Sequence, residues 1–326
     1  MQRRLLLSGM LTLVVIAGVF LSQRNTEYIV EQSPSPRATV MPAAVSDETA
    51  LLFVGDIMLS RSVGVLMAEK DDYLWPFRNI AEFLRSADLT FANLENPVSS
   101  RGVKVGSIYS FRADPKTLDG MQYAGFDIVS IANNHMWDYG RQAFVDTLTH
   151  LADEGIEYVG GGLNSEEAHQ PIIKKLNRTS IAFLAYTEFL QSVAAGPNSA
   201  GITRWDIKAI KADIAAAKQQ NDLVVVSFHW GDEYQPIHNA KQEQFAHAAI
   251  DAGADLIIGH HPHVVQDVEQ YQGKWIVYSL GNFIFDQTFS KETMTGLAIK
   301  AYVEGDAITR IEEISIRISK EYQASL

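Results

Sequence analysis

The chain has 326 residues, of which 47% are hydrophobic, and a formal net charge of −12. This length suits one large domain or two ordinary ones with a sizeable core, and the acidic balance argues against a body that binds nucleic acid. Cysteine is absent, so disulfides, thiolate metal sites and thiol nucleophiles are excluded.

The N-terminal segment carries the pattern of a membrane-targeting sequence. Arg3 and Arg4 precede an apolar run from Leu5 to Leu21, which ends in bulky residues with no small-x-small cleavage site. A positive flank before an apolar run is typical of an export signal or a single membrane anchor. We expect residues 1–22 to form an uncleaved, single-pass signal anchor in the cell membrane, with a cleaved signal as the alternative. The positive flank then places the remainder outside the cytoplasm, in a periplasmic or extracellular position.

A polar linker is expected between this anchor and the folded part. Residues 23–48 contain Ser33-Pro34-Ser35-Pro36 and few apolar side chains, which is typical of a disordered tether. We expect one folded domain over residues 49–326.

Within this domain, apolar runs of strand length alternate with stretches of helical spacing. The expected strands are 51–54, 88–92, 127–131, 156–159, 172–175, 181–186, 223–228, 256–258, 264–268, 274–279, 294–302 and 308–318. The expected helices are 77–84, 115–123, 142–153, 206–218 and 241–252. Gln272-Gly273 predicts a hairpin turn. Alternating units followed by a run of strands predict a layered α/β sandwich, with a second sheet from the C-terminal part.

Five short polar clusters directly follow apolar runs. They are Gly55-Asp56, Asn93-Leu94-Glu95, Asn133-Asn134-His135, His229-Trp230-Gly231 and Gly259-His260-His261-Pro262-His263. Side chains at the carboxyl ends of strands converge in an α/β fold. A set of carboxylates, an amide and imidazoles suits Mn²⁺, Fe²⁺ or Zn²⁺. The clusters therefore predict a site for one or two divalent metal ions; the alternative is five unrelated strand-end loops.

These clusters and their spacing resemble the poly-γ-glutamate capsule synthesis family called CapA or PgsA. The matching stretches are 53–59, 92–95, 111–113, 130–135, 138–140, 228–231, 259–264 and 279–283. The family looks like a branch of the calcineurin-like metallophosphoesterases. The resemblance implies an α/β fold of the four-layered αββα type with a dinuclear metal centre.

The resemblance also implies a role for single residues. Those that match metal ligands are Asp56 and His263 at the first ion, Glu95 as the bridge, and Asn134, His229 and His261 at the second ion. His135 matches the histidine that stabilises the leaving group or developing charge. Met58 stands where the phosphoesterases usually have His, and Glu95 where they usually have Asp. The first metal position therefore lacks an imidazole and is left to water or another side chain.

Two further residues near these clusters have alternative interpretations. Asp138 is interpreted either as the hydrogen-bond partner of His135 or as the N-cap of the helix that begins near Arg141. We interpret His260 as a strand-end histidine that faces solvent, in preference to a metal ligand.

Basic side chains gather between the second and third clusters. Arg101, Lys104, Arg112 and Lys116 lie in a stretch whose only acid is Asp114. The stretch is interpreted either as a flap that contacts an anionic substrate or as a solvated loop. Arg61 and Asn282 are further candidates for substrate binding, in addition to Arg101 and Arg112.

Two functions are compatible with these features. The first is a membrane-anchored, extracytoplasmic, metal-dependent hydrolase or transferase of poly-γ-glutamate or capsule biosynthesis, which works with the membrane proteins that make and export the polymer. The second is a non-catalytic accessory of that synthase and export complex that binds metal or polymer. The retained ligands favour the first, and Met58 favours the second. An anionic polymer fits the family, and a phosphorylated or lipid-linked substrate fits equally.

Overall fold

The structure is a computed structural model that describes residues 48–105 and 108–326. The expected anchor, 1–22, and the linker up to residue 47 lie outside the described residues. Among the residues that are described, no helix has the length and apolar character needed to cross a membrane.

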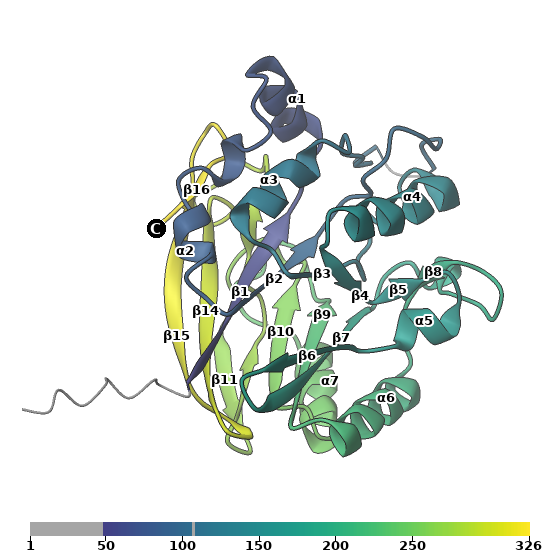
Figure 1. Cartoon of the computed structure of the whole chain (residues 1–326), viewed down its shortest axis with the longest axis vertical. Coiled ribbons are helices and arrows are strands. Elements are labelled where there is room, and N and C mark those ends of the chain that lie inside the picture. Colours follow the sequence, from purple (N-terminus) through teal and green to yellow (C-terminus); the bar gives the residue numbers. More distant parts are fainter. Residues whose placement is uncertain (1–47, 106–107) are drawn as a thin grey trace, which may run out of the picture. The chain divides into compact units, whose positions relative to one another are not determined.

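The first sheet is built around β1 (Thr49–Ile57) and runs in the order β16-β15-β14-β1-β2-β3-β4 (Figure 1). Strand β13 (Asn282–Ile284) pairs with the end of β1 outside this path. The remaining bounds are β2 (Leu89–Leu94), β3 (Ile128–Ser130), β4 (Glu157–Val159), β14 (Thr295–Glu304), β15 (Ala307–Ile318) and β16 (Ala324–Ser325). Strands β1 to β4 are parallel, and β14 joins β1 in antiparallel orientation.

The second sheet runs in the order β11-β12-β10-β9-β7-β6. Its strands are β6 (Ile172–Leu176), β7 (Thr179–Thr187), β9 (Leu223–His229), β10 (Leu256–His260), β11 (Val268–Tyr271) and β12 (Lys274–Val277). A separate pair joins β5 (Gly161–Gly162) to β8 (Gly201–Ile202).

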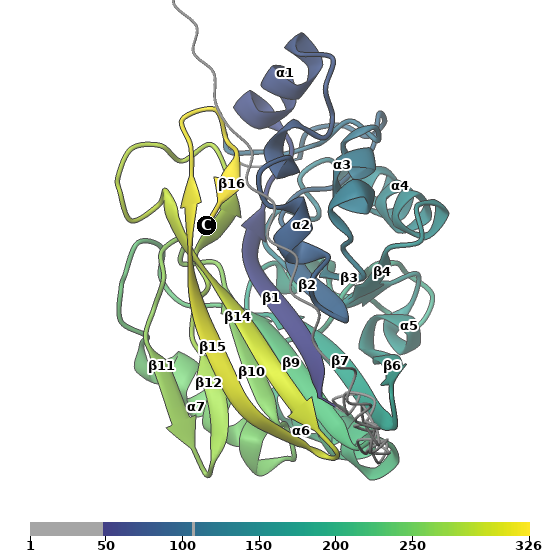
Figure 2. The same ribbon diagram turned by 60° about the vertical axis from the view of Figure 1, so that its left-hand side comes forward.

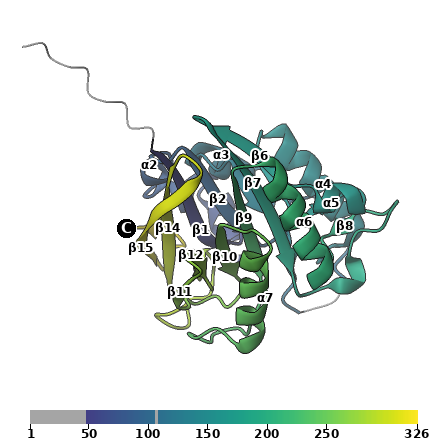
Figure 3. The same ribbon diagram turned by 90° about the horizontal axis from the view of Figure 1, so that it is seen from below.

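Helices cover the outer face of each sheet. The first sheet carries α1 (Arg61–Glu69), α2 (Ala81–Leu84), α3 (Thr117–Ala124) and α4 (Gly140–Asp153). The second carries α6 (Ile207–Gln220) and α7 (Ala240–Asp251), which Figure 3 shows side by side. The short α5 (Ser165–His169) lies against β5, and 3₁₀ turns occupy Trp75–Phe77 and Gln191–Val193.

The hydrophobic core is divided by the alternation of side chains along the strands. In β1, Phe53 faces the second sheet, whereas Leu52 and Val54 face the helices of the first. The Phe91 ring lies 5.8 Å from Phe53 and 6.0 Å from Phe183 of β7, centroid to centroid, so it joins the two sheets. Strands buried on both faces read as continuous apolar runs, which is why the sequence marked them clearly. The predicted mixed α/β class is confirmed.

The predicted origin of the second sheet is correct for β11 and β12 and wrong for the two long strands that follow them. The C-terminal strands β14 and β15 return to the first sheet, where Phe53 is opposite Ile299, and Figure 2 shows them beside β1. The second sheet comes from the middle of the chain. The hairpin at Gln272-Gly273 is confirmed by the pairing of β11 with β12. The strand expected at 264–268 is mainly a loop, and α1 was not predicted.

Candidate metal centre

The polar clusters from both sheets meet at the carboxyl ends of their parallel strands, as expected for an α/β fold. Asp56 lies near the end of β1, and Glu95 directly follows β2. His229 ends β9, and His261 and His263 lie in the loop after β10. The ligand atoms of Asp56, Glu95 and His229 lie within 4.8 Å of one another, so the two sheets contribute to one site.

Asn93 links the two carboxylates. Its Nδ2 donates to Asp56 Oδ1 at 2.8 Å and to Glu95 Oε2 at 3.2 Å, while its Oδ1 accepts from Asn133 Nδ2 at 3.1 Å. All four side chains are fully buried. Glu95 Oε1 has no hydrogen-bond partner among the described residues. A buried carboxylate oxygen without a partner is costly, and a bound cation would offset that cost.

The two carboxyl groups differ in their tendency to ionise. Burial, followed by the negative charge of Asp56, raises the pKa of Glu95 well above its ordinary value. Burial also acts to raise the pKa of Asp56, but its contacts with His260 and His263 outweigh burial and hold that pKa well below the ordinary value. In the absence of a cation, Asp56 therefore ionises more readily than Glu95.

Asn282 orients the imidazole of His263. The amide Nδ2 of Asn282 donates to the Thr293 carbonyl at 2.9 Å, so its Oδ1 faces His263 Nδ1 at 3.0 Å and accepts from it. His263 Nε2 then bears the lone pair and lies 3.6 Å from Glu95 Oε1, as a metal ligand requires. The predicted contact of Asn282 with substrate is not supported by its position, because the residue is fully buried and its amide is occupied below the site.

His229, Asn134 and His261 form a second group. His229 Nε2 lies 2.8 Å from Asn134 Oδ1, and the rings of His229 and His261 have centroids 4.8 Å apart. His261 Nδ1 is buried and has no partner in the described part of the chain. Burial lowers the pKa of His261 to about 3. Burial and the nearby imidazole of His261 lower the pKa of His229 well below its ordinary value. Both imidazoles are therefore neutral at physiological pH, which is the form that binds metals.

His135 is held by Asp138 at the edge of the centre. His135 Nδ1 lies 2.8 Å from Asp138 Oδ2, and the same oxygen accepts from the Phe111 backbone N–H at 2.7 Å. The N-cap of α4 is Tyr139, so of its two interpretations Asp138 is the partner of His135. The Phe111 ring stacks on the imidazole at 3.9 Å between centroids. His135 Nε2 lies 3.9 Å from Glu95 Oε1 and faces the centre.

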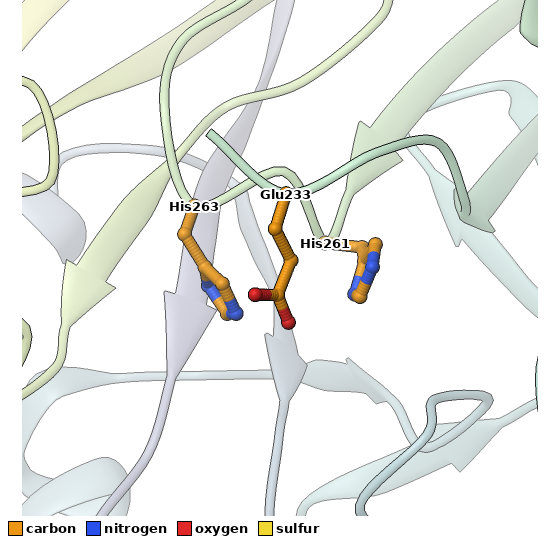
Figure 4. Close-up of side chains that lie close together, drawn as sticks. All are labelled: Glu233, His261 and His263. Atoms are coloured by element: carbon orange, nitrogen blue, oxygen red, sulfur yellow. The ribbon is translucent and has the colours of Figure 1, made fainter. Parts of the chain in front are cut away.

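Two positions near the centre, one histidine and one glutamate, were not anticipated. His260, expected to face solvent, is fully buried with Nδ1 3.2 Å from Asp56 Oδ1. The alternation of β10 explains this, because Leu256 and Ile258 also face the space between the sheets. Glu233, in the loop after β9, places its carboxylate with His261 and His263 in a group whose ligand atoms lie within 4.8 Å (Figure 4).

Met58 contributes to the core and not to this centre. It is fully buried in the cluster between the first sheet and its helices, and its sulfur accepts from the Ser60 backbone and hydroxyl. The side chain at this position therefore does not take the place of the metal-binding imidazole that phosphoesterases usually have there.

A cavity of about 660 Å³ opens above the centre. Its lining includes Arg61, Phe111, His135, Glu233, Tyr234 and His263. Of the four predicted substrate-binding residues, Arg61 is the one placed here, and its guanidinium pairs with Asp286 at 2.9 Å.

The predicted contacts of Arg101 and Arg112 with substrate are not supported by their positions. Arg101 forms an ion pair with Asp146 of α4. Arg112 donates to the carbonyl of Arg101 at 2.9 Å and lies 4.2 Å from the centroid of the Tyr139 ring. These contacts hold both guanidiniums to the protein, and neither residue is part of the cavity lining found among the described residues.

The arrangement of the two sheets and their helices is a mixed α/β fold that is also found in solved structures. Two solved structures are similar in fold: a hypothetical protein from Thermus thermophilus (TM-score 0.52, 18% identity, 82% of this chain and 98% of that one) and a putative 5'-nucleotidase from Staphylococcus aureus (TM-score 0.51, 14% identity, 82% of this chain and 54% of that one).

The chain belongs to the bacterial capsule synthesis protein family PGA_cap, whose model matches residues 50–287. It is 35% identical to the PGA biosynthesis protein CapA of Bacillus subtilis, over 83% of this chain and 72% of that protein. It is 31% identical to the capsule biosynthesis protein CapA of Bacillus anthracis, over 84% of this chain and 69% of that protein. The resemblance drawn from the sequence is confirmed.

Proposed function

We propose that this protein is a membrane-anchored, extracytoplasmic, metal-dependent hydrolase or transferase that acts in capsule or poly-γ-glutamate biosynthesis. The observation that carries the proposal is the buried ligand set contributed by both sheets, with Glu95 Oε1 and His261 Nδ1 unpaired among the described residues. Purely structural residues would be expected to pair such atoms within the protein.

The donor set fits one or two divalent ions. The residues that would hold them are Asp56, Glu95, Asn134, His229, His261 and His263. Oxygen and imidazole donors without thiolate suit Mn²⁺, Fe²⁺ or Zn²⁺. When bound, such ions polarise a substrate oxygen and lower the pKa of bound water.

The residues around the ligands supply positioning and proton exchange. Asp138 accepts a hydrogen bond from His135 Nδ1 and fixes the ring, so His135 Nε2 is directed at a group above the centre. A histidine in this position can give a proton to a leaving oxygen or nitrogen. His260 lies beside Asp56, with its Nδ1 3.2 Å from Asp56 Oδ1.

An anionic polymer is the proposed substrate. Arg61 lies on the cavity wall, and a second cavity of about 650 Å³ shares Tyr234 and Phe289 with the first. Two cavities with a common wall favour an extended chain over a small molecule. The proposed partners are the membrane proteins that make and export the polymer, and the names of the two Bacillus relatives connect those proteins with biosynthesis of PGA and of the capsule.

The alternative is a non-catalytic accessory that uses the centre to bind metal or polymer. Met58 favours it, because the first metal position lacks an imidazole from β1. A 27% identical relative from Mycobacterium tuberculosis is also called a probable polyglutamine synthesis accessory protein.

Turnover by the purified full chain in detergent separates the two functions. We would supply Mn²⁺ or Zn²⁺ and measure cleavage or transfer of poly-γ-glutamate and of a phosphodiester, with His135→Gln as the test variant. Loss of a metal-dependent turnover in a variant that retains its metal supports the enzyme. Absence of turnover in the parent, with polymer production in cells unaffected by His135→Gln but abolished by Asp56→Asn, supports the accessory.

A further inference from the structure

We propose that Glu233 is a metal ligand of this centre, and that it supplies from the loop after β9 the donor that β1 lacks at Met58. The inference rests on the metal centre proposed above and concerns a residue outside the ligand set implied by the sequence.

The backbone brings Glu233 to the two histidines. The neighbouring Tyr234 donates its backbone N–H to the Pro262 carbonyl at 2.8 Å, which ties the loop after β9 to the loop after β10. Tyr234, His261 and His263 all have positive φ, at 62°, 98° and 58°. Such conformations cost about 1–3 kcal/mol each in a residue other than glycine and gather at functional sites. The loops after β9 and β10 are thus held in an unfavourable backbone conformation. This conformation directs the side chains of Glu233, His261 and His263 at one point.

The side chains have the spacing that one ion needs. Figure 4 shows the Glu233 carboxylate between the imidazoles of His261 and His263, with one ligand atom from each residue within 4.8 Å of the others. Metal–nitrogen and metal–oxygen bonds of about 2.1 Å place two ligands of one ion at most about 4.2 Å apart. Small side-chain rotations are therefore enough for Glu233 to share an ion with His263, which the family resemblance assigns to the first ion, the one whose ligand set lacks an imidazole.

The acidic neighbours of Glu233 have structural partners elsewhere. Asp232 accepts from Asn239 Nδ2 at 2.8 Å, beside the start of α7. Glu188 accepts from the Gly231 backbone at 2.7 Å and pairs with Lys241. Glu233 lines the cavity, with a side-chain hydrogen bond to Tyr234, and Asp56 and Glu95 form a buried acidic pair beneath this cavity. Adding a third carboxylate next to these two is unfavourable unless cations occupy the space between them.

Exposure gives this ligand a particular role. Glu233 is exposed, whereas His261 and His263 are buried and fixed by their surroundings. A ligand held on one side only is the one that an incoming anionic group can displace. Among the three residues of this group, Glu233 would therefore be the ligand that is open to the cavity.

Metal binding to the full chain in detergent tests the inference, with Mn²⁺ or Zn²⁺ alone as the probe. We would compare Glu233→Gln with Asp232→Asn, which removes the same charge from the adjacent exposed residue, by elemental analysis and titration calorimetry. We expect Glu233→Gln to lose one equivalent of metal or to bind the weaker ion at least tenfold less tightly, while Asp232→Asn matches the parent. The Co²⁺ absorption spectrum should change in Glu233→Gln only.

A further variant and a stability measurement in chelator distinguish a metal ligand from a structural residue. Glu233→His, which restores a donor, should recover stoichiometry, and in chelator Glu233→Gln should be at least as stable as the parent, because it removes a carboxylate next to Asp56 and Glu95. If Glu233→Gln keeps the parent's stoichiometry, affinity and Co²⁺ spectrum, Glu233 is not a ligand, although the metal centre stands. A parent that binds no metal overturns both. If Glu233→Gln is less stable in chelator and Glu233→His does not recover metal, Glu233 is a structural residue and the inference fails.

Discussion

Replacement of Glu95 by Gln should stabilise the metal-free protein and destabilise the metal-loaded one. Burial and the charge of Asp56 raise the pKa of Glu95 above its ordinary value of 4.5. At pH values between 4.5, the ordinary pKa of Glu95, and its raised pKa in the folded protein, the folded state binds a proton that the unfolded state has released. The free energy of unfolding of the metal-free parent therefore falls as pH rises through this window, by up to about 1.4 kcal/mol per pH unit. Gln has no proton to lose, so the variant lacks this slope.

The expected difference in thermal midpoint between the parent and Glu95→Gln is large enough to be measured in a thermal scan. In a domain of this size, about 1 kcal/mol moves the midpoint of thermal unfolding by roughly 2–3 °C. In chelator, raising the pH from 4.5 towards the raised pKa of Glu95 should therefore lower the parent's midpoint relative to Glu95→Gln, by up to about 3 °C per pH unit. Saturating Mn²⁺ should reverse the order, because an ion that binds only the folded state stabilises it and Gln withdraws the bridging charge.

Circular dichroism or fluorescence scans at several pH values, with chelator and with Mn²⁺, would measure both effects. Glu69→Gln is the matched control, since Glu69 is exposed on α1. If the midpoints of the parent and Glu95→Gln stay parallel across pH in chelator, the raised pKa of Glu95 is refuted. A variant that keeps full metal occupancy would show that Glu95 does not bridge the ions.

Three other predictions each concern a single contact. Asp138→Asn removes the negative charge beside His135 Nδ1 and leaves only a neutral amide to orient the ring, so turnover should fall about 10–100-fold at unchanged metal content, as measured by kinetics and elemental analysis. Gly55→Ala places a Cβ 2.0 Å from the Gly281 carbonyl, so it should displace the end of β1 and lower both the thermal midpoint and the metal occupancy. Phe91→Ala should cost about 3–5 kcal/mol in denaturant unfolding, because it opens a cavity between the sheets; a cost below about 1 kcal/mol would contradict this packing.

The sequence predicts those parts of the fold that depend on local patterns. Apolar runs identified β1, β2, β7, β9 and β10 because these strands are buried on both faces. The polar residue after each run then placed the ligands in one region. Which strands share a sheet could not be read in this way, because the pairing of Phe53 with Ile299 joins positions far apart in the chain.

The same limit applies to the candidate site. An exposed acid such as Glu233 has no local pattern, and its position depends on the contact between Tyr234 and Pro262. The basic stretch at residues 101–116 predicted a local excess of positive charge. It did not predict that Arg101 would pair with Asp146 of the later helix α4. His260 is different, since the alternation from Leu256 through Ile258 already directed it between the sheets.

The contribution of both sheets to one centre has a consequence for folding. Asp56 and Glu95 come from the first sheet and His229 from the second, so an ion that joins them would cross-link the two. Strand β1 also needs β14 as its neighbour, with Thr49 opposite Val303. The coordination sphere therefore forms only after almost the whole chain has been made and its long-range pairs have closed, which is a slow step. The ions present where folding finishes, and not those present where translation begins, would then decide which metal the protein carries.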